Sequence, residues 1–287
     1  MQVQNIPSNL LLYSKRAFNW RLNSSPFLTG DLFADNADLA FFTPRFRQRK
    51  MSRRDISASR VVFCPSHKLE EMLELYGSSI NASVLILGNS DREFHNLEFR
   101  LPTSIKHVFA QNLLNPSQRA TVLPIGLENR RLATNGQLGN FSRGLTLAEK
   151  QKKILIGPFS NTHPEREVFF SGKIDSSEEV VTLSGRIPPK TYAELSSRFQ
   201  FIAAPRGNGI DTHRFWEALY RGSLPIVLDN SWSEQIRALE IPHLNVNSWS
   251  SLELTALLRR SSSKTIDPNL IPSLWWPFWK SRITTYL

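Results

Sequence analysis

The sequence predicts an α/β fold with two parallel sheets that are joined by a polar linker. Two observations support this prediction. Short apolar runs alternate with helical or loop segments on both sides of residues 130–150, where Gly, Asn and Ser accumulate. One run, residues 83–88, is almost entirely apolar and ends in glycine, as a parallel strand buried on both faces does. With 287 residues, 40% of them hydrophobic, the chain has the length for two domains with separate cores.

The first half becomes regular only from residue 60 onward. A helix is predicted at residues 69–76 from the spacing of its apolar side chains. Strands are predicted at residues 61–64, 83–88, 106–110 and 120–125. We assign residues 1–145 to an N-terminal domain, in which residues 1–55 are irregular and basic.

The second half repeats this alternation after the linker. Strands are predicted at residues 153–157, 180–183, 199–204 and 224–228, and helices at 192–198, 211–221, 233–239 and 252–260. Gly222 stands where the residue after a helix C-terminus is expected. We assign residues 146–287 to a C-terminal domain that ends in an aromatic tail. Two such domains place a cleft between them, where ligands commonly bind.

Composition limits the compartment and the chemistry. A single cysteine, Cys64, excludes an internal disulfide framework, and its apolar neighbours predict a buried core residue rather than a reactive thiol. No signal-peptide pattern and no run of about 18 apolar residues is present, so we expect a cytoplasmic protein without a transmembrane helix. The histidines are scattered without the paired spacing of metal ligands, so no metal site is expected.

The net charge of +10 favours polyanionic partners, and the basic residues are densest at residues 45–54. This run has two interpretations: a solvated helix or loop face, and a polyanion contact. For a contact, an anionic membrane surface ranks ahead of nucleic acid, because no nucleic-acid fold signature accompanies the charge. Lipid binding would place the protein peripherally at the inner membrane surface.

The residues with the clearest chemistry form the loop 206–210 and the helix predicted after it. In an open parallel sheet, ligands bind at such a junction between a strand end and a helix start. The free N–H groups and the dipole of the helix favour a phosphate there. Gly207 and Gly209 remove the Cβ atoms that would keep an anion away, and Asp211 or Thr212 is expected to cap the helix.

Charged side chains around this loop fit a nucleotide diphosphate. Arg206 and Arg214 can each give bidentate hydrogen bonds to a pyrophosphate. Glu217 follows Arg214 by three residues, shares its helix face and can accept both hydroxyls of a ribose. The same spacing also fits a purely structural arrangement, with an intrahelical Arg214–Glu217 pair and a packed Trp216.

Residues 199–227 resemble the C-terminal signature of exostosin-like glycosyltransferases, and in particular the short bacterial members with the GT-B architecture. A more distant resemblance is to fucosyltransferases, whose signature has Thr-Glu-Lys where this chain has Thr212-His213-Arg214. Weaker similarities are found at residues 109–112, 123–129 and 159–166. The resemblance covers roughly residues 60–250, and the first 50 residues match no family.

The resemblance implies two Rossmann-type domains that face each other across a cleft, with the nucleotide sugar bound mainly by the C-terminal domain and the acceptor on the N-terminal side. Arg206 and Arg214 would neutralise the diphosphate leaving group, and Glu217 would hold the ribose. The other implied donor-binding residues are Thr162, Arg166, Gly207, Asn208, Gly209, Asp211 and Thr212. Neither a metal nor a cofactor is implied, in agreement with the lack of an Asp-x-Asp triplet.

The implied reaction is transfer of a sugar from a nucleotide diphosphate to a glycan or lipid-linked acceptor in surface polysaccharide synthesis. The resemblance favours inversion, which requires a base for the acceptor hydroxyl. Glu128, in a Gly-containing loop after a predicted strand, is our first choice, with Asp91 and His107 as rivals. The alternative function is a catalytically inactive nucleotide- or glycan-binding module, because no base is evident from the sequence.

Overall fold

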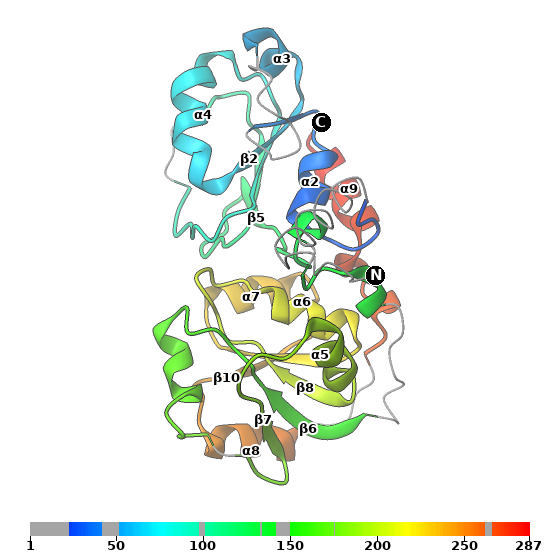
Figure 1. The fold of residues 1–287 in the computed structure, drawn as a ribbon. Coiled ribbons are helices and arrows are strands. Elements are labelled where there is room, and N and C mark those ends of the chain that lie inside the picture. Colours follow the sequence, from blue (N-terminus) through cyan, green and yellow to red (C-terminus); the bar gives the residue numbers. More distant parts are fainter. Residues whose placement is uncertain are drawn as a thin grey trace, which may run out of the picture.

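The computed structural model describes residues 23–41, 52–97, 101–132, 134–141, 150–174, 176–261 and 266–287. It contains two parallel five-stranded sheets, one in each half of the molecule (Figure 1). The first sheet has the order β1-β2-β3-β4-β5, with β1 Leu39–Ala40, β2 Val61–Pro65, β3 Val84–Gly88, β4 His107–Ala110 and β5 Ala120–Val122. The second has the order β10-β9-β8-β6-β7, with β6 Gln151–Ile156, β7 Val180–Thr182, β8 Phe199–Ala203, β9 Leu224–Leu228 and β10 Leu244–Val246.

These parallel sheets confirm the predicted α/β class, and the two strand orders differ in a way that matters for ligand binding. The described strands of the first sheet follow one another in sequence order. In the second sheet the order reverses between β6 and β8, because β7 lies outside β6 while β8, β9 and β10 continue on the other side. Such a reversal separates the loops at the carboxyl ends of the two strands and opens a crevice there.

Helices cover both faces of each sheet, which explains the continuous apolar runs of the central strands. Along β2 and β3 successive side chains enter opposite clusters. Val62 and Leu85 pack on the face covered by α4 (Leu69–Tyr76), and Phe63 and Ile86 pack on the face of α2 (Gly30–Asp35). Cys64 is buried in β2, where burial raises its thiol pKa, as expected for a core residue.

Most predicted elements lie within one or two residues of the observed ones. The predicted helix 69–76 coincides with α4. The four helices predicted in the second half correspond to α5 Pro189–Ser196, α6 His213–Tyr220, α7 Ser231–Ala238 and α8 Ser251–Arg260. Gly222 has a φ of 71° directly after α6, which is the predicted helix end. The stretch 1–55 was expected to be irregular but contains α2, β1 and the start of α3 (Arg53–Ala58).

The chain returns to its first half at the C-terminal end. Helix α9 (Trp276–Thr284) lies beside α2 in Figure 1, although it follows the second sheet in sequence. Trp279 is fully buried, and its ring contacts those of Phe33 and Phe109 edge-on, each with a centroid separation of 6.4 Å. Its indole N–H donates to the Ser273 carbonyl at 2.8 Å. The aromatic tail therefore completes the core of the first sheet.

Helices α6 and α7 lie between the two sheets (Figure 1). Phe215 and Trp232 from these helices belong to the same buried cluster as Leu113 and Val122 of the first half. The Gln235 side-chain amide donates to the carbonyls of Leu113 and Leu114, each at 2.8 Å. A continuous apolar cluster thus joins the halves and holds the carboxyl ends of their strands together.

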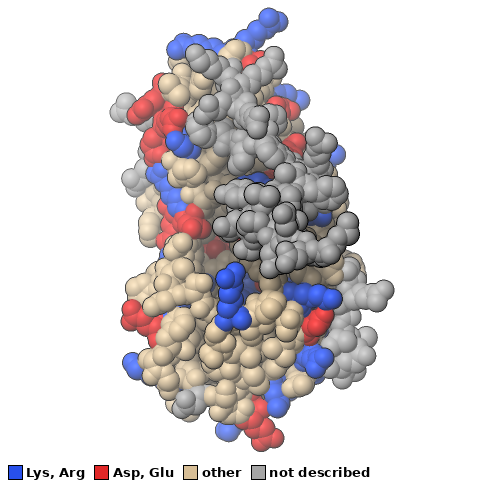
Figure 2. Space-filling model, viewed as in Figure 1, with Lys and Arg blue, Asp and Glu red and all other residues tan. Residues whose placement is uncertain are grey.

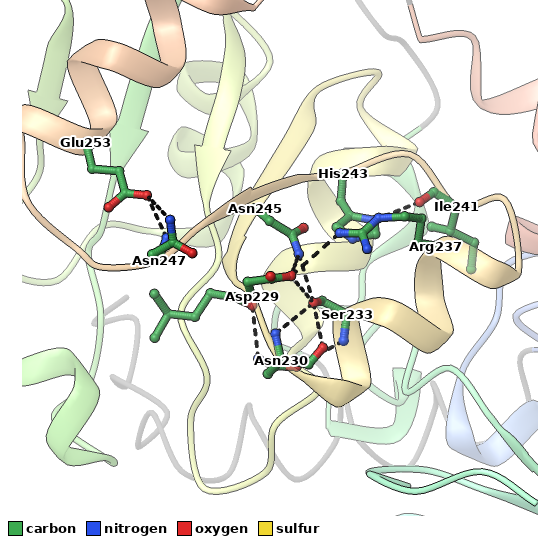
Figure 3. A network of polar contacts seen from close by, with 10 residues as sticks. Asp229, Asn230, Ser233, Arg237, Ile241, His243, Asn245, Asn247 and Glu253 are labelled. Atoms are coloured by element: carbon green, nitrogen blue, oxygen red, sulfur yellow. Dashed lines mark hydrogen bonds and ion pairs between the residues drawn. The ribbon is translucent and has the colours of Figure 1, made fainter.

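A polar network fixes the start of α7 at the carboxyl ends of β9 and β10 (Figure 3). Asn230 and Ser233 form a reciprocal capping box, in which the Asn230 side chain accepts the Ser233 N–H at 2.9 Å. Asn245, from β10, donates to the Ser233 hydroxyl at 2.9 Å and to Asp229. This network sets the direction from which α7 enters the interface between the halves.

Some of the expected regions fall outside the described residues. The predicted boundary between residues 145 and 146 lies within 142–149, and most of the basic run 45–54 lies within 42–51. In the part of the chain that the structure describes, no helix has the length and apolarity needed to cross a membrane.

Candidate functional site

A cavity of about 400 Å³ lies at the reversal point between β6 and β8. The loop after β6, the start of α5, the loop after β8 and the first turns of α6 form most of its wall. Asp91, Ile125 and Asn135 complete the wall from the first half. Nine residues that were predicted to bind a donor line this cavity: Thr162, Arg166, Gly207, Asn208, Gly209, Asp211, Thr212, Arg214 and Glu217.

This arrangement agrees with the GT-B-like architecture that the resemblance implies. Residues following β3 and β5 meet residues following β6 and β8 across the cavity, so the carboxyl ends of both sheets border it. On the face shown in Figure 2, both basic and acidic side chains lie along the level where the halves meet. The lining of the cavity is itself polar on both sides, with Asp91 and Asn135 from the first half and Arg166, Arg214 and Glu217 from the second.

Helix α6 begins at the cavity, with Thr212 as its N-cap residue. The Thr212 side chain makes no capping hydrogen bond, in contrast to the sequence expectation. Asp211, the other candidate, is not a cap either, because its carboxylate accepts the Ile125 N–H and the Trp216 indole N–H, each at 2.8 Å. Neither of the two predicted caps therefore makes a side-chain hydrogen bond to the first turn of α6, and this turn borders the cavity.

Arg214 stands in this first turn and packs against an aromatic ring. Its guanidinium lies 4.1 Å from the centroid of Tyr192 and also donates to the Tyr192 hydroxyl. Further hydrogen bonds run to the carbonyls of Gly157 at 3.2 Å and Pro158 at 3.3 Å. These contacts fix a positive charge in the cavity wall beside the helix N-terminus.

Glu217 lies one turn further along α6, between two arginines. Its carboxylate is 3.8 Å from Arg214 Nε and 3.5 Å from Arg221 Nη1, and 8% of its side chain is exposed. Burial lowers the pKa of Arg221, and the neighbouring Glu217 partly opposes this effect. The intrahelical Arg214–Glu217 pair of the structural interpretation is present, and both of its members also line the cavity.

Arg166 organises the opposite wall. Its guanidinium donates to the carbonyls of Arg206 at 2.7 Å and Ser160 at 2.9 Å, and to the Thr162 hydroxyl at 3.2 Å. Burial lowers the pKa of Arg166, and the charge of Arg214 adds to this effect. A Cβ at Gly207 would meet Arg166 Nη2 at 3.1 Å, so glycine lets the loop approach this side chain closely.

Arg206 is not among the residues that line the cavity, and it forms an ion pair with Glu93 of the first half. Its side chain is 21% exposed and has one further hydrogen bond, at 3.4 Å, to the Asn208 carbonyl. The predicted diphosphate contact of Arg206 thus requires its guanidinium to leave Glu93.

Several hydrogen bonds join the loop after β8 to the first half. The Asp211 N–H donates to Asn112 Oδ1 at 3.0 Å, and Asn208 donates to Asp91 at 3.2 Å. A Cβ at Gly209 would lie 2.7 Å from Asn112 Oδ1, so the loop has room for glycine alone at this point. Burial raises the pKa of Asp211 to about 7. The loop is therefore positioned by both domains.

Two of the three candidate bases lie outside the cavity lining. Glu128 accepts hydrogen bonds within its own loop, from the Thr134 hydroxyl at 2.5 Å and from the N–H groups of Asn135 at 2.6 Å and Gly136 at 3.2 Å. His107 is buried, and burial, assisted by Arg282 and Arg119, lowers its pKa to about 4.

Sequence reasoning missed two titratable residues of the cavity, Tyr192 and His213. His213 is the first residue of α6 and lines the cavity, with Nδ1 2.8 Å from the Gly126 carbonyl oxygen. Asp91, the third candidate base, lines the cavity as well. The position of His213 directly before Arg214 is the one sequence signal that pointed to it. Among the described residues, no three His, Cys, Asp or Glu side chains are grouped to hold a metal ion.

No protein-family model and no curated protein matches the sequence. Two similar solved structures are both of glycosyltransferases. AviGT4, a glycosyltransferase involved in avilamycin A biosynthesis, aligns with 79% of this chain and 83% of its own, at 11% identity and a TM-score of 0.39. An alpha1,3-fucosyltransferase aligns with 63% of this chain and 57% of its own, at 14% identity and a TM-score of 0.33. These similarities assign no family to the chain, so its function has to be argued from the cavity itself.

Proposed function

We propose that this chain is a glycosyltransferase that binds a nucleotide diphosphate sugar in the cavity and transfers the sugar to a glycan or lipid-linked acceptor. One observation carries the proposal. At the strand-order reversal, an uncapped helix N-terminus, the Arg214 guanidinium and the Glu217 carboxylate converge on one polar cavity. The resemblance of residues 199–227 to exostosin-like enzymes supports a sugar donor as the ligand.

The diphosphate would lie over the first turn of α6. The helix N–H groups and Arg214 provide a donor set that needs no rearrangement, because Tyr192 already fixes the guanidinium. When the bond between the anomeric carbon and the phosphate oxygen breaks, negative charge develops on that oxygen. Preorganised donors stabilise this charge more in the transition state than in the ground state, which lowers the barrier.

The ribose and the base would extend from the diphosphate along α6 toward the start of α5. Glu217 lies one turn beyond Arg214, with a carboxylate able to accept ribose hydroxyls. Phe159, Ile187 and Pro189 add apolar surface to the wall for a base. Arg166 would act mainly by holding the loop after β8. Arg206 would bind the phosphates only after its ion pair with Glu93 is broken.

The acceptor would approach from the first half, where Asp91 and Asn135 border the cavity. An inverting outcome, independence of a metal and a place in surface polysaccharide synthesis rest on the resemblance. A peripheral contact with an anionic membrane would suit a lipid-linked acceptor.

Calorimetry with UDP and GDP, followed by a donor-hydrolysis assay, tests this proposal. Arg214→Ala and Glu217→Ala are each expected to lower kcat/KM by about tenfold or more, which corresponds to about 1.4 kcal/mol. Arg259→Ala, on the exposed side of α8, is the matched control and should keep wild-type turnover. Near-normal turnover by both cavity variants refutes the assignment. Diphosphate binding without turnover of any donor would instead favour the inactive binding module.

A further inference from the structure

The His213 ring has one nitrogen hydrogen-bonded to the protein, and the residue lines the cavity. Nδ1 lies 2.8 Å from the Gly126 carbonyl oxygen. A carbonyl oxygen can only accept, so Nδ1 carries the hydrogen. In the neutral ring the lone pair is therefore on Nε2. Among the described residues no group is hydrogen-bonded to Nε2, and His213 lines the cavity.

The carbonyl that orients this ring is itself firmly placed. Gly126 has a φ of 67°, and a Cβ there would lie 2.2 Å from the Leu28 carbonyl oxygen. The next residue, Leu127, donates its N–H to the same Leu28 oxygen at 2.8 Å. The turn of the first half is therefore tightly packed, and it points its Gly126 carbonyl at the second half. His213 consequently links α6 to this turn of the first half, and it lines the cavity between them.

We infer that His213 is the general base that accepts the proton of the acceptor hydroxyl. This inference rests on the proposed glycosyl transfer. In the step, the hydroxyl proton moves to Nε2 while the hydroxyl oxygen forms a bond to the anomeric carbon. The bond from that carbon to the phosphate oxygen breaks, and the nucleoside diphosphate leaves with the electron pair. The Gly126 carbonyl stabilises the imidazolium through Nδ1–H.

The other carboxylates are less suited to this role. Glu128 already accepts four hydrogen bonds from its own loop, and Asp91 is exposed and accepts the Asn208 amide. The charged groups that share the cavity with His213 come from the loop after β3, from η6 (Pro164–Phe169), from the loop after β8 and from α6: Asp91, Arg166, Asp211, Arg214 and Glu217. A bound diphosphate would balance the two arginines and so favour the protonation that a base undergoes.

A second role for the same atom has the opposite pH dependence. A protonated His213 could donate Nε2–H to the leaving phosphate as a general acid, and activity would then fall as pH rises. As a base, His213 has to be neutral before reaction, so activity rises with pH. The sign of the pH profile therefore distinguishes the two roles.

The test compares His213→Asn with Glu128→Gln in donor hydrolysis and transfer, using UDP-glucose, UDP-galactose, GDP-mannose and GDP-fucose. Asparagine can keep the bond to the Gly126 carbonyl, because its amide Nδ2 replaces Nδ1, but it cannot take a proton. We expect kcat to fall by about 10²-fold or more. UDP and GDP affinities should stay within about threefold of wild type, and the acidic limb of the kcat/KM profile should disappear. Any limb due to Asp211 remains in this variant, so the limb that disappears belongs to His213.

Three results overturn the inference. The kcat/KM profile of His213→Asn keeps every acidic limb of the wild-type profile, the limb disappears in Glu128→Gln instead, or wild-type activity falls with rising pH. In all three cases the wild-type protein still binds UDP or GDP and turns over a donor, so the proposed function stands. If the wild-type protein binds neither diphosphate and hydrolyses no donor, the proposed function fails and the inference fails with it.

Discussion

Replacing Asp211 with asparagine should change how the stability of the protein depends on pH. Burial raises the pKa of this carboxyl from 3.8 to about 7. A carboxyl whose pKa is higher in the folded state stabilises the fold below its unfolded pKa, and this contribution is lost as pH rises through the folded pKa. Each pKa unit corresponds to about 1.4 kcal/mol. As pH rises from 5 to 8, the ionisation of Asp211 therefore lowers the free energy of unfolding by about 2–3 kcal/mol.

The asparagine of the Asp211→Asn variant cannot titrate, so in this variant residue 211 does not lower the free energy of unfolding between pH 5 and pH 8. The substitution also places an amide NH₂ against one of two N–H donors, because Asp211 accepts from both Ile125 and Trp216. An unsatisfied buried donor costs about 1–3 kcal/mol. We therefore expect Asp211→Asn to be less stable than wild type at pH 5, with the difference shrinking by about 2–3 kcal/mol at pH 8.

Urea unfolding at both pH values measures the two differences directly, because the m-value should not change. The difference in the free energy of unfolding between the wild type and the variant at each pH excludes the contributions of the other titrating groups, because both proteins share them. An unchanged stability difference between pH 5 and pH 8 would refute the conclusion that burial controls this carboxyl.

Two further predictions concern packing. Trp279→Ala should lower the free energy of unfolding by about 3–5 kcal/mol, because it leaves a cavity at a fully buried site against Phe33. Urea titrations measure this change. A loss below about 1 kcal/mol would mean that α9 is not part of the core of the first sheet. Gly209→Ala should lower UDP or GDP affinity and destabilise the protein by about 1–3 kcal/mol, since its Cβ would meet Asn112 Oδ1 at 2.7 Å. Gly77→Ala, where a Cβ meets nothing within 4 Å, is its control, and equal effects of the two alanines would contradict the steric argument.

The sequence predicted those elements whose apolar pattern is set by local burial. Strand β3 and helix α4 are examples, because a strand buried on both faces and a helix buried on one have distinct periodicities. Strand β1 has two residues, and α2 has six residues, most of them buried, so neither carries a recognisable period. The return of α9 to the first sheet depends on contacts across the whole chain, which no local pattern contains.

In the candidate site, too, the features set by local sequence were predicted, and those set by contacts between distant segments were not. The residues from Gly207 to Glu217 are close in sequence, and one strand–loop–helix junction was enough to predict that they share a cavity. Contacts between the domains were not predictable, because they depend on how the two sheets are placed. The partner of Arg206 is Glu93, and Asp211 takes the Ile125 N–H instead of capping α6. His213 was missed for this reason, since its orientation comes from Gly126.

The most direct test of the account is a crystal structure of the protein soaked with UDP or GDP. We expect the phosphates to lie over the first turn of α6, within hydrogen-bond distance of Arg214, with the ribose hydroxyls on Glu217. Nucleotide bound away from the crevice between β6 and β8, or phosphates that contact neither Arg214 nor the helix N–H groups, would contradict the proposed donor site.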